Sequence, residues 1–259
     1  MTLEIDIRPV IANIAAYRFV LLDDTETLRR RFHDLCVTLG LKGTILLAPE
    51  GINLFLAGPN DAISQFLANL GRDRRFAAIE AKWSWSDFVP FKHLRVKRKN
   101  EIVTMRFDGV DPANTPAPAI LPTELKHWYE DGRDFVILDT RNKWEVAAGT
   151  FRNAVNPHLR TFSEFPSAIG ALERFKDKTV VTFCTGGIRC EKAAPLLRLR
   201  GFGEVFQLRG GILKYFEECG GAHWQGNCAV FDDRGALDPQ LRSMNEAGEH
   251  LSIEADQQL

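Results

Sequence analysis

A proline-rich segment near the middle of the chain limits how the sequence can fold. Residues 111–122 contain four prolines, at positions 112, 116, 118 and 122. Each proline removes a backbone hydrogen-bond donor and fixes its own φ angle, so neither a helix nor a central strand can run through the segment. The chain has 259 residues, which is enough for two hydrophobic cores. We therefore predict a linker over residues 111–122, with one domain before it and one after it.

The residues before this linker alternate between strand and helix patterns. Apolar residues at helical spacing, such as Leu28, Phe32 and Leu35, predict a helix, while short apolar runs flanked by turn residues predict strands. The predicted strands cover residues 17–22, 44–47, 52–56 and 79–85, and the predicted helices cover residues 25–39 and 61–70. This β-α-β-β-α-β order predicts a ferredoxin-like (acylphosphatase-like) α+β domain over residues 1–110. The same order occurs in proteins of many functions and identifies none of them.

The residues after the linker predict an α/β domain over residues 123–219 and a C-terminal tail over residues 220–259. Continuous apolar runs at residues 135–138, 180–183 and 205–208 are typical of strands buried on both faces. Helices are predicted over residues 123–129, capped by Thr123, over residues 191–199 and over residues 211–216. This alternation predicts an open parallel sheet with helices on its faces. Chemistry in such sheets gathers beyond the carboxyl ends of the strands, and Cys184 directly follows one of them.

The candidate active-site loop consists of Cys184, Thr185, Gly186, Gly187, Ile188 and Arg189. The glycines let successive backbone N–H groups turn toward the sulfur, and the following helix adds the positive end of its dipole. Such an anion nest lowers the pKa of a thiol below its usual value of about 8.5, and the thiolate is the nucleophilic form. Arg189 would add a fork of donors for an incoming anion or phosphate. We therefore expect Cys184 to be catalytic; the alternative is an inert buried cysteine whose glycines serve only the turn.

The loop and two further motifs resemble the rhodanese superfamily. Leu138-Asp139-Thr140-Arg141 looks like the first signature of that family, and Leu208-Arg209-Gly210-Gly211 looks like its closing signature. The resemblance covers residues 123–219 and implies a rhodanese-like open parallel-sheet domain in which Cys184 carries sulfur as a persulfide. Asp139 and Arg141 match positions that organise the loops, so we expect a structural ion pair there.

Three longer strings narrow the resemblance. They are residues 47–53 (LAPEGIN), residues 184–193 (CTGGIRCEKA) and residues 230–234 (VFDDR). Together, over residues 15–237, they resemble the rhodanese-domain tRNA uridine hydroxylases, whose amino-terminal domain is ferredoxin-like. That resemblance implies oxygen-dependent hydroxylation of uridine-34 in tRNA to 5-hydroxyuridine, with molecular oxygen and an unidentified electron donor as co-reactants. No other cofactor is evident. Many members carry extra paired cysteines in the tail, but here only Cys219 and Cys228 remain, so we expect no metal site.

A basic segment provides candidate tRNA-binding residues. If residues 91–100 are extended, one face carries His93, Arg95, Lys97 and Lys99. Such a stripe can follow the phosphates of an RNA backbone. The alternative is an edge strand whose lysines prevent aggregation. Trp83 and Trp85 have the spacing of one packed face, although tryptophans can also stack on bases.

Two residues that follow the loop leave their roles open. Cys190 lies six residues after Cys184 and is a candidate resolving thiol. We favour a buried, inert thiol, because sequence spacing does not define the geometry between two sulfur atoms. Lys192 is expected to face either the pocket or water.

The net charge and the cysteine pattern restrict which partners and which cellular compartment we expect. The net charge of −1 provides no overall field toward a polyanion, so a tRNA site must be a local patch. The chain start lacks the pattern of a signal peptide, and no stretch approaches the roughly 20 apolar residues that cross a bilayer. Five cysteines form no regular framework, so we expect reduced thiols in the cytoplasm and neither a membrane nor DNA as partner. The oligomeric state is left open.

Four functions compete at this point. tRNA uridine hydroxylation rests on the family resemblance, whereas rhodanese-type sulfur transfer follows directly from the loop and needs no oxygen. A cysteine phosphatase would also use a thiolate and an arginine, but related phosphatases have one residue more than the four between Cys184 and Arg189. A non-catalytic binding module is disfavoured because the cysteine is present. We predict an enzyme, with the hydroxylase first and the sulfurtransferase as the alternative.

Overall fold

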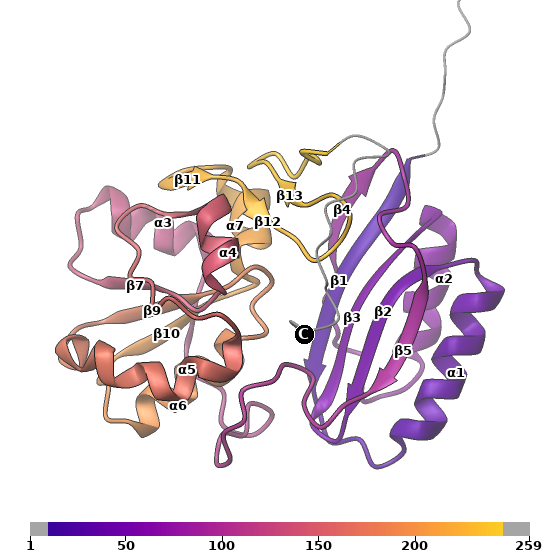
Figure 1. Cartoon of the computed structure of the whole chain (residues 1–259), viewed down its shortest axis with the longest axis horizontal. Coiled ribbons are helices and arrows are strands. Elements are labelled where there is room, and N and C mark those ends of the chain that lie inside the picture. The colour runs from indigo at the N-terminus through magenta and orange to yellow at the C-terminus, as the bar shows by residue number, and fades with distance from the viewer. Residues whose placement is uncertain (1–9, 246–259) are drawn as a thin grey trace, which may run out of the picture.

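The computed structural model describes residues 10–245, and its two main β-sheets lie in separate halves of the chain (Figure 1). The first half contains strands β1 (Ile11–Phe19), β2 (Lys42–Ala48), β3 (Gly51–Gly58), β4 (Lys82–Ser86) and β5 (Leu94–Arg98), and helices α1 (Thr25–Thr38) and α2 (Asn60–Gly71). The strand order is β4-β1-β3-β2-β5, and both helices cover one face of the sheet (Figure 1). The predicted ferredoxin-like arrangement is confirmed, and β5 extends it by pairing in parallel with β2.

The position of β1 differs most from the prediction. We predict a strand over residues 17–22, but β1 begins at Ile11 and ends at Phe19. Two of its core-facing residues, Ala12 and Ala16, are small and give a weak hydrophobic signal in the sequence. Beyond β1 the chain follows the neighbouring turn, where the Leu22 N–H donates to the Pro49 carbonyl oxygen at 2.9 Å.

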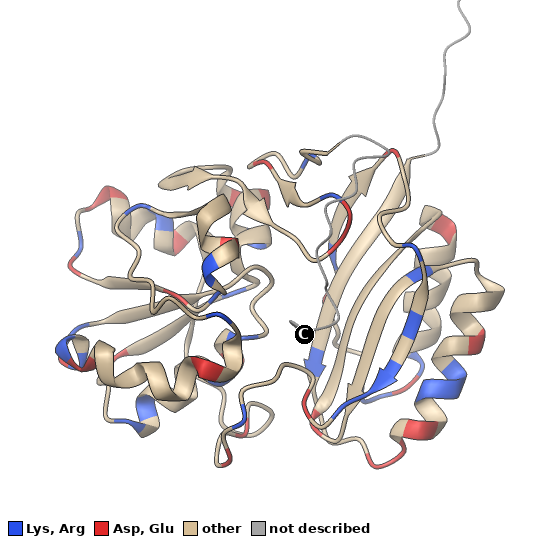
Figure 2. Cartoon of the chain, viewed as in Figure 1, with Lys and Arg blue, Asp and Glu red and all other residues tan. Residues whose placement is uncertain are grey.

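The face of this sheet that lies opposite the helices carries polar and charged side chains. Ala12, Ile14 and Ala16 of β1 belong to the core that α1 and α2 cover, so Tyr17 points to the other face. Strand pairing and alternation place on that face Asn53 and Phe55 of β3, Lys82 of β4, and Arg95 and Lys97 of β5. Figure 2 shows the resulting row of cations along β5. This face is turned toward the second half of the chain (Figure 1).

Trp83 and Trp85 lie on β4 at the edge of the sheet. Their rings stack on each other, with 6.0 Å between centroids. Because β4 is an edge strand, the two residues remain 36% and 46% exposed. The expectation that they form one packed face is therefore correct for their mutual contact and wrong for their burial.

The second half contains a parallel sheet of order β6-β10-β9-β7. Its strands are β6 (Ala119–Ile120), β7 (Val136–Asp139), β9 (Val180–Phe183) and β10 (Val205–Leu208), and its helices are α3 (Pro122–Glu130), α4 (Lys143–Ala148), α5 (Phe165–Ala168), α6 (Cys190–Leu199) and α7 (Gly211–Cys219). Two 3₁₀ helices, η1 (Phe162–Glu164) and η2 (Ile169–Phe175), flank α5, and short antiparallel pairs join β8 (Gly149–Phe151) to β11 (Trp224–Gly226) and β12 (Cys228–Ala229) to β13 (Ala236–Leu237). The predicted open parallel sheet is confirmed. Within residues 10–245, no helix is both long enough and apolar enough to cross a membrane.

The proline-rich segment is more regular at its end than predicted. Residues 119 and 120 form β6, which pairs with β10 at the edge of the sheet, where neighbouring prolines are tolerated. Pro122 is the first residue of α3, a position at which a backbone N–H would have no partner within the helix. Thr123 therefore lies inside α3 and is not its cap, and Leu121 occupies the cap position.

A buried lysine joins the two halves. Lys192 of α6 is 3% exposed, and its ammonium lies 2.9 Å from Glu50 Oε1 and 2.7 Å from Glu101 Oε2. Glu50 belongs to the turn between β2 and β3, and Glu101 follows β5, so both carboxylates come from the first half. We call these three residues the Lys192 clasp. Lys192 thus faces neither the pocket nor water, the two roles that the sequence left open.

Further hydrogen bonds cross between the halves. The Tyr17 hydroxyl of β1 donates to Glu191 Oε1 at 3.1 Å. Arg234 of the tail is held by Asp232 at 2.6 Å and donates to Ser84 Oγ of β4 at 2.7 Å. The three strings that carry the family resemblance therefore meet at the boundary between the halves, where each provides at least one polar contact.

We predict that Lys192→Met lowers the free energy of unfolding by about 3 kcal/mol, because it leaves two half-buried carboxylates without their cation. Urea titration of the full chain measures this change. Arg160→Met is the matched control, because Arg160 pairs with Glu164 at the surface and its side chain is 77% exposed. Breaking such a pair costs at most about 1 kcal/mol. Equal losses in the two variants would show that the clasp does not stabilise the fold.

Candidate active site

The candidate active-site loop connects the end of β9 to the start of α6. Gly187 in this loop has a φ of +101°, a conformation that residues with a side chain rarely adopt. The Tyr17 hydroxyl lies 2.8 Å from the position that a Cβ at Gly187 would take. The turn therefore favours glycine, and a side chain at this position would also displace the Tyr17 hydroxyl. The turn directs the Gly187 N–H at Cys184, with 3.1 Å between nitrogen and sulfur.

The environment of Cys184 favours the thiolate. Burial alone raises the pKa of this thiol, but a hydrogen bond from the Cys190 thiol and the charge of Arg189 oppose the effect of burial. The backbone N–H groups of Arg189 and Cys190 also donate to the sulfur, and together these interactions lower the pKa of Cys184 to about 6. At neutral pH the Cys184 sulfur is therefore predominantly ionised.

Arg189 contacts Glu145 rather than an open anion site. Its two terminal nitrogens lie 2.6 Å and 2.7 Å from the Glu145 carboxylate, which is fully buried. Thr185 Oγ1 donates to the same carboxylate at 3.1 Å. This geometry corrects the expectation that the fork of Arg189 is directed at an incoming anion. In this structure Arg189 acts on Cys184 through its positive charge, and Glu145 holds it in place.

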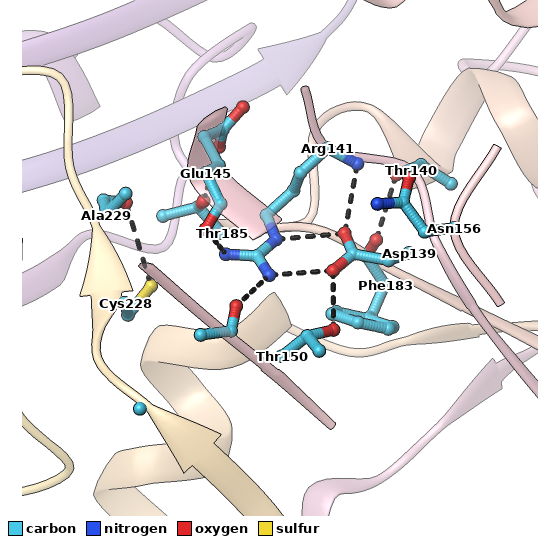
Figure 3. A network of polar contacts seen from close by, with 12 residues as sticks. Asp139, Thr140, Arg141, Glu145, Thr150, Asn156, Phe183, Thr185, Cys228 and Ala229 are labelled. Atoms are coloured by element: carbon cyan, nitrogen blue, oxygen red, sulfur yellow. Dashed lines mark hydrogen bonds and ion pairs between the residues drawn. The ribbon is translucent and has the colours of Figure 1, made fainter. Parts of the chain in front are cut away.

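A second buried ion pair supports α4, the helix that carries Glu145. Arg141 donates to Asp139 through Nε at 2.9 Å and through a terminal nitrogen at 2.7 Å, and both side chains are fully buried (Figure 3). The same guanidinium donates to the Gly149 carbonyl oxygen at 2.6 Å, and Thr150 Oγ1 donates to Asp139 at 2.8 Å. The expected structural ion pair is confirmed. It fixes the segment from β7 to β8 beneath the loop.

Cys190 is fully buried at the first position of α6. Burial raises the pKa of its thiol well above the usual value, and the neighbouring Cys184 raises it further. Cys190 therefore stays protonated and donates to the Cys184 thiolate, an interaction that sequence spacing did not indicate. Its role as a resolving thiol remains a prediction.

The remaining cysteines differ from Cys184 in charge. All five cysteines lie in the described part of the chain, and none of them forms a disulfide. Burial raises the pKa of the Cys36 thiol and of the Cys228 thiol to about 12, so both are protonated at neutral pH. Among the residues that the structure describes, no group of three or more His, Cys, Asp or Glu side chains is arranged to hold a metal ion.

A cavity of about 280 Å³ lies between the two halves, and the candidate active-site loop forms part of its wall. The second half contributes Cys184, Thr185, Gly186, Ile188, Arg189 and Phe231, and the first half contributes Tyr17, Asn53, Phe55 and Lys82 from the polar face of its sheet. These first-half residues were not predicted from the sequence as part of the site. Their shared alternation along β1, β3 and β4 is a signal that could have marked one face, but only the docking of the halves shows that this face meets Cys184.

Several cations lie at or near this cavity. Lys82 and Lys99 line it together with Arg106. The Lys82 ammonium lies 4.9 Å from the centroid of the Tyr17 ring, and burial lowers the pKa of this lysine. Of the predicted basic stripe, Arg95 and Lys97 lie on β5, Lys99 follows it into the cavity wall, and His93 precedes it and is exposed. Because β5 is also an edge strand, the structure places the stripe where either of its two predicted roles can operate.

Comparison with known proteins relates both halves to described families. Residues 11–102 match the UPF0176 acylphosphatase like domain, and residues 121–218 match the rhodanese-like domain. The tRNA uridine(34) hydroxylase of Cupriavidus taiwanensis is 55% identical over 237 residues, which are 89% of this chain and 84% of that protein. The tRNA uridine(34) hydroxylase of Bordetella avium is 53% identical over 238 residues, which are 90% of this chain and 98% of that protein. The solution structure of a rhodanese-like domain from Anabaena sp. is 26% identical, covers 42% of this chain and 79% of its own, and gives a TM-score of 0.36.

We predict that the Cys184 thiol titrates with a midpoint near pH 6. The measurement is the ultraviolet absorbance of the thiolate, taken as the difference between the wild type and Cys184→Ser. Cys190→Ala removes a donor to the thiolate, so the midpoint should rise by about 1–2 pH units. Cys36→Ala is the matched control, because it removes a buried thiol of the other half, and it should leave the midpoint unchanged. A wild-type midpoint near pH 9 would contradict the anion nest.

Proposed function

The chain belongs to the tRNA uridine(34) hydroxylase family, and we propose that it hydroxylates uridine-34 of tRNA to 5-hydroxyuridine with Cys184 as the reactive group. One observation carries this proposal: the Cys184 thiolate faces a cavity whose walls come from both halves of the chain. A sulfur carrier needs only the loop of the second half. The wall of aromatic, polar and cationic side chains from the first half suits a nucleotide.

The size of the cavity supports a single nucleotide as the occupant. Its volume of about 280 Å³ lies at the lower limit of small-molecule sites, which span roughly 300–1,000 Å³. A stacked anticodon would not fit, so the target base would have to leave its stack to reach Cys184, as in other enzymes that modify bases. Tyr17 and Phe55 line the cavity and offer ring faces on which a base can stack.

The charge of the cavity supports an anionic substrate. The chain as a whole has a net charge of −1, so its overall field does not attract RNA. Lys82, Lys99 and Arg106 concentrate positive charge at the cavity, where phosphate groups next to an inserted base would lie. We propose that these three residues, with Arg95 and Lys97 on β5, form the local tRNA-binding surface.

Hydroxylation at C5 of uracil replaces a C–H bond with a C–OH bond. With molecular oxygen as the source, one oxygen atom enters the base and the other leaves as water, which takes up two electrons and two protons. We therefore propose molecular oxygen and an electron donor as co-reactants.

Cys184 supplies an anionic sulfur at the cavity wall. The thiolate can also take a sulfur atom from a sulfane-sulfur donor, which leaves with the electron pair of the broken S–S bond, so that Cys184 carries a persulfide. Both forms are anions, and the N–H groups that point at the Cys184 sulfur stabilise either of them. A tRNA substrate and a reactive reduced thiol both fit a cytoplasmic location, which we propose for this protein.

We predict that deletion of the gene removes 5-hydroxyuridine and the nucleosides derived from it from tRNA. Complementation with the wild type should restore them, and Cys184→Ser should not, because serine offers no thiolate. Cys36→Ser is the matched control and should restore them fully. Mass spectrometry of tRNA nucleosides measures each outcome. Full modification with Cys184→Ser would reject the assigned role of this residue.

We predict that replacing Arg95, Lys97 and Lys99 together by glutamine weakens tRNA binding and flattens its salt dependence. Each lost phosphate contact should reduce the slope of log K against log salt by about 0.7–0.9. Replacing Arg30, Arg72 and Arg74 by glutamine makes the same change in net charge on the helix side of the domain and should leave the slope unchanged. Unaltered binding by the first variant would assign the stripe to protection of the edge strand.

A further inference from the structure

Asn53 is a polar residue placed on the cavity face of an otherwise apolar strand. It lies on β3 between Ile52 and Leu54, which belong to the core on the opposite face. Strand pairing sets Asn53 beside Tyr17 of β1, and both residues line the cavity that contains Cys184. Asn53 is only 2% exposed, so its polar atoms face the interior of the protein and the cavity rather than bulk water.

One hydrogen bond fixes the orientation of the Asn53 amide. Its Nδ2 donates to the Ile102 carbonyl oxygen at 3.1 Å. A carbonyl oxygen accepts only from a donor, so this contact assigns the nitrogen end of the amide and leaves Oδ1 as the free acceptor. Within residues 10–245, Asn53 Oδ1 accepts no hydrogen bond. It is also not fully buried, in contrast to the unpaired Oδ1 of Asn13.

A fixed acceptor distinguishes the two pyrimidines of RNA. Uracil carries a hydrogen on N3 and donates there, whereas cytosine has a lone pair at N3 and accepts. An acceptor held against N3 therefore pairs with uracil and opposes cytosine, and a buried polar group left without its partner penalises the wrong base strongly. We propose that Asn53 Oδ1 accepts the N3–H of the target base and thereby selects uridine over cytidine, an inference that rests on the proposed function.

Asn53 and the Cys184 loop form different parts of the cavity wall, and this agrees with the positions of N3 and C5 in a pyrimidine ring. In a pyrimidine ring the edge that carries C5 and C6 lies opposite the edge that carries N3. A base whose N3 faces Asn53 on the sheet directs C5 away from β3, toward the part of the cavity that the Cys184 loop forms. Phe55 follows two residues later on the same face of β3 and is placed to contact a ring held there.

A purely structural role for Asn53 has to be separated from recognition. The backbone of Ile102 is held on both sides, because its N–H donates to Glu50 Oε1 at 2.7 Å and its carbonyl oxygen accepts from Asn53. Glu50 thus holds the same residue as Asn53 but does not line the cavity. Glu50→Gln is therefore the matched control for any substitution at Asn53.

The first test leaves Asn53 unchanged and varies the RNA. Full-length Cys184→Ser protein is titrated with anticodon stem-loops that carry uridine, cytidine or 3-methyluridine at position 34, and fluorescence anisotropy reports the affinity. Uridine should bind about 10-fold more tightly than cytidine or 3-methyluridine, because both alternatives lack the N3–H donor. Equal affinity for uridine and cytidine would overturn the proposal.

The second test adds Asn53→Ala in the same Cys184→Ser background. The preference for uridine over cytidine should fall to within about 2-fold, and 3-methyluridine should gain affinity relative to uridine because its methyl group now has space. Glu50→Gln should change the three affinities by a common factor. An Asn53→Ala variant that weakens all three RNAs equally and keeps the preference would assign the residue to structure alone. If this variant does not fold, the first test still decides.

These binding experiments do not depend on turnover. If uridine is preferred but the wild type forms no 5-hydroxyuridine, the proposed reaction fails and the role of Asn53 stands. If hydroxylation proceeds but the preference is absent, the role of Asn53 fails and the proposed reaction stands.

Discussion

The buried ammonium of Lys192 is the contact on which the geometry of the site depends. A buried charge without a partner costs several kcal/mol, so Lys192 is tolerated only while the carboxylates of Glu50 and Glu101 surround it. Both carboxylates come from the first half of the chain, and Lys192 lies in the first turn of α6, directly after the candidate active-site loop. Undocking of the halves would leave this ammonium uncompensated. The clasp therefore holds the polar sheet face against the loop, and the cavity exists only in that arrangement.

The buried carboxylates near Cys184 are paired with arginines, so they do not compete with the thiolate as negative charges. A buried carboxylate near the sulfur would by itself disfavour a thiolate. Burial raises the pKa of Glu145, but the charge and hydrogen bonds of Arg189, together with the charge of Arg141 and a backbone hydrogen bond, lower it below its usual value, so Glu145 stays ionised and is paired. Asp139 and Arg141 form a second pair behind it. With these carboxylates paired to arginines, the Gly187 N–H and its neighbours stabilise the thiolate against the effect of burial without an unpaired carboxylate opposing them.

Local patterns predict the fold and the position of the Cys184 loop, whereas long-range contacts are not predictable from them. The spacing of Leu28 and Phe32 indicated a helix over residues 25–39, and α1 covers Thr25–Thr38, because helical periodicity depends only on near neighbours. The Cys184 loop was recognisable for the same reason. The partner of Arg189 is 44 residues away in the sequence, and no local pattern selects Glu145 among the acidic residues of the chain. Likewise, Tyr17 and Lys82 reach the cavity through strand pairing and domain docking, which sequence spacing does not encode.

The turn between β2 and β3 links domain docking to the cavity through the backbone of one residue, Ile102. Gly51 begins β3 at a point where a Cβ would collide with the Arg18 carbonyl oxygen, so the turn is fixed closely against β1. On either side of this glycine, Glu50 accepts the N–H of Ile102 and Asn53 donates to its carbonyl oxygen. Glu50 also binds Lys192, so the Lys192 clasp and the Asn53 amide contact the same residue, Ile102, from opposite sides. Docking of the halves and the contact that orients the cavity acceptor therefore share the β2–β3 turn region, but of Glu50 and Asn53 only Asn53 lines the cavity.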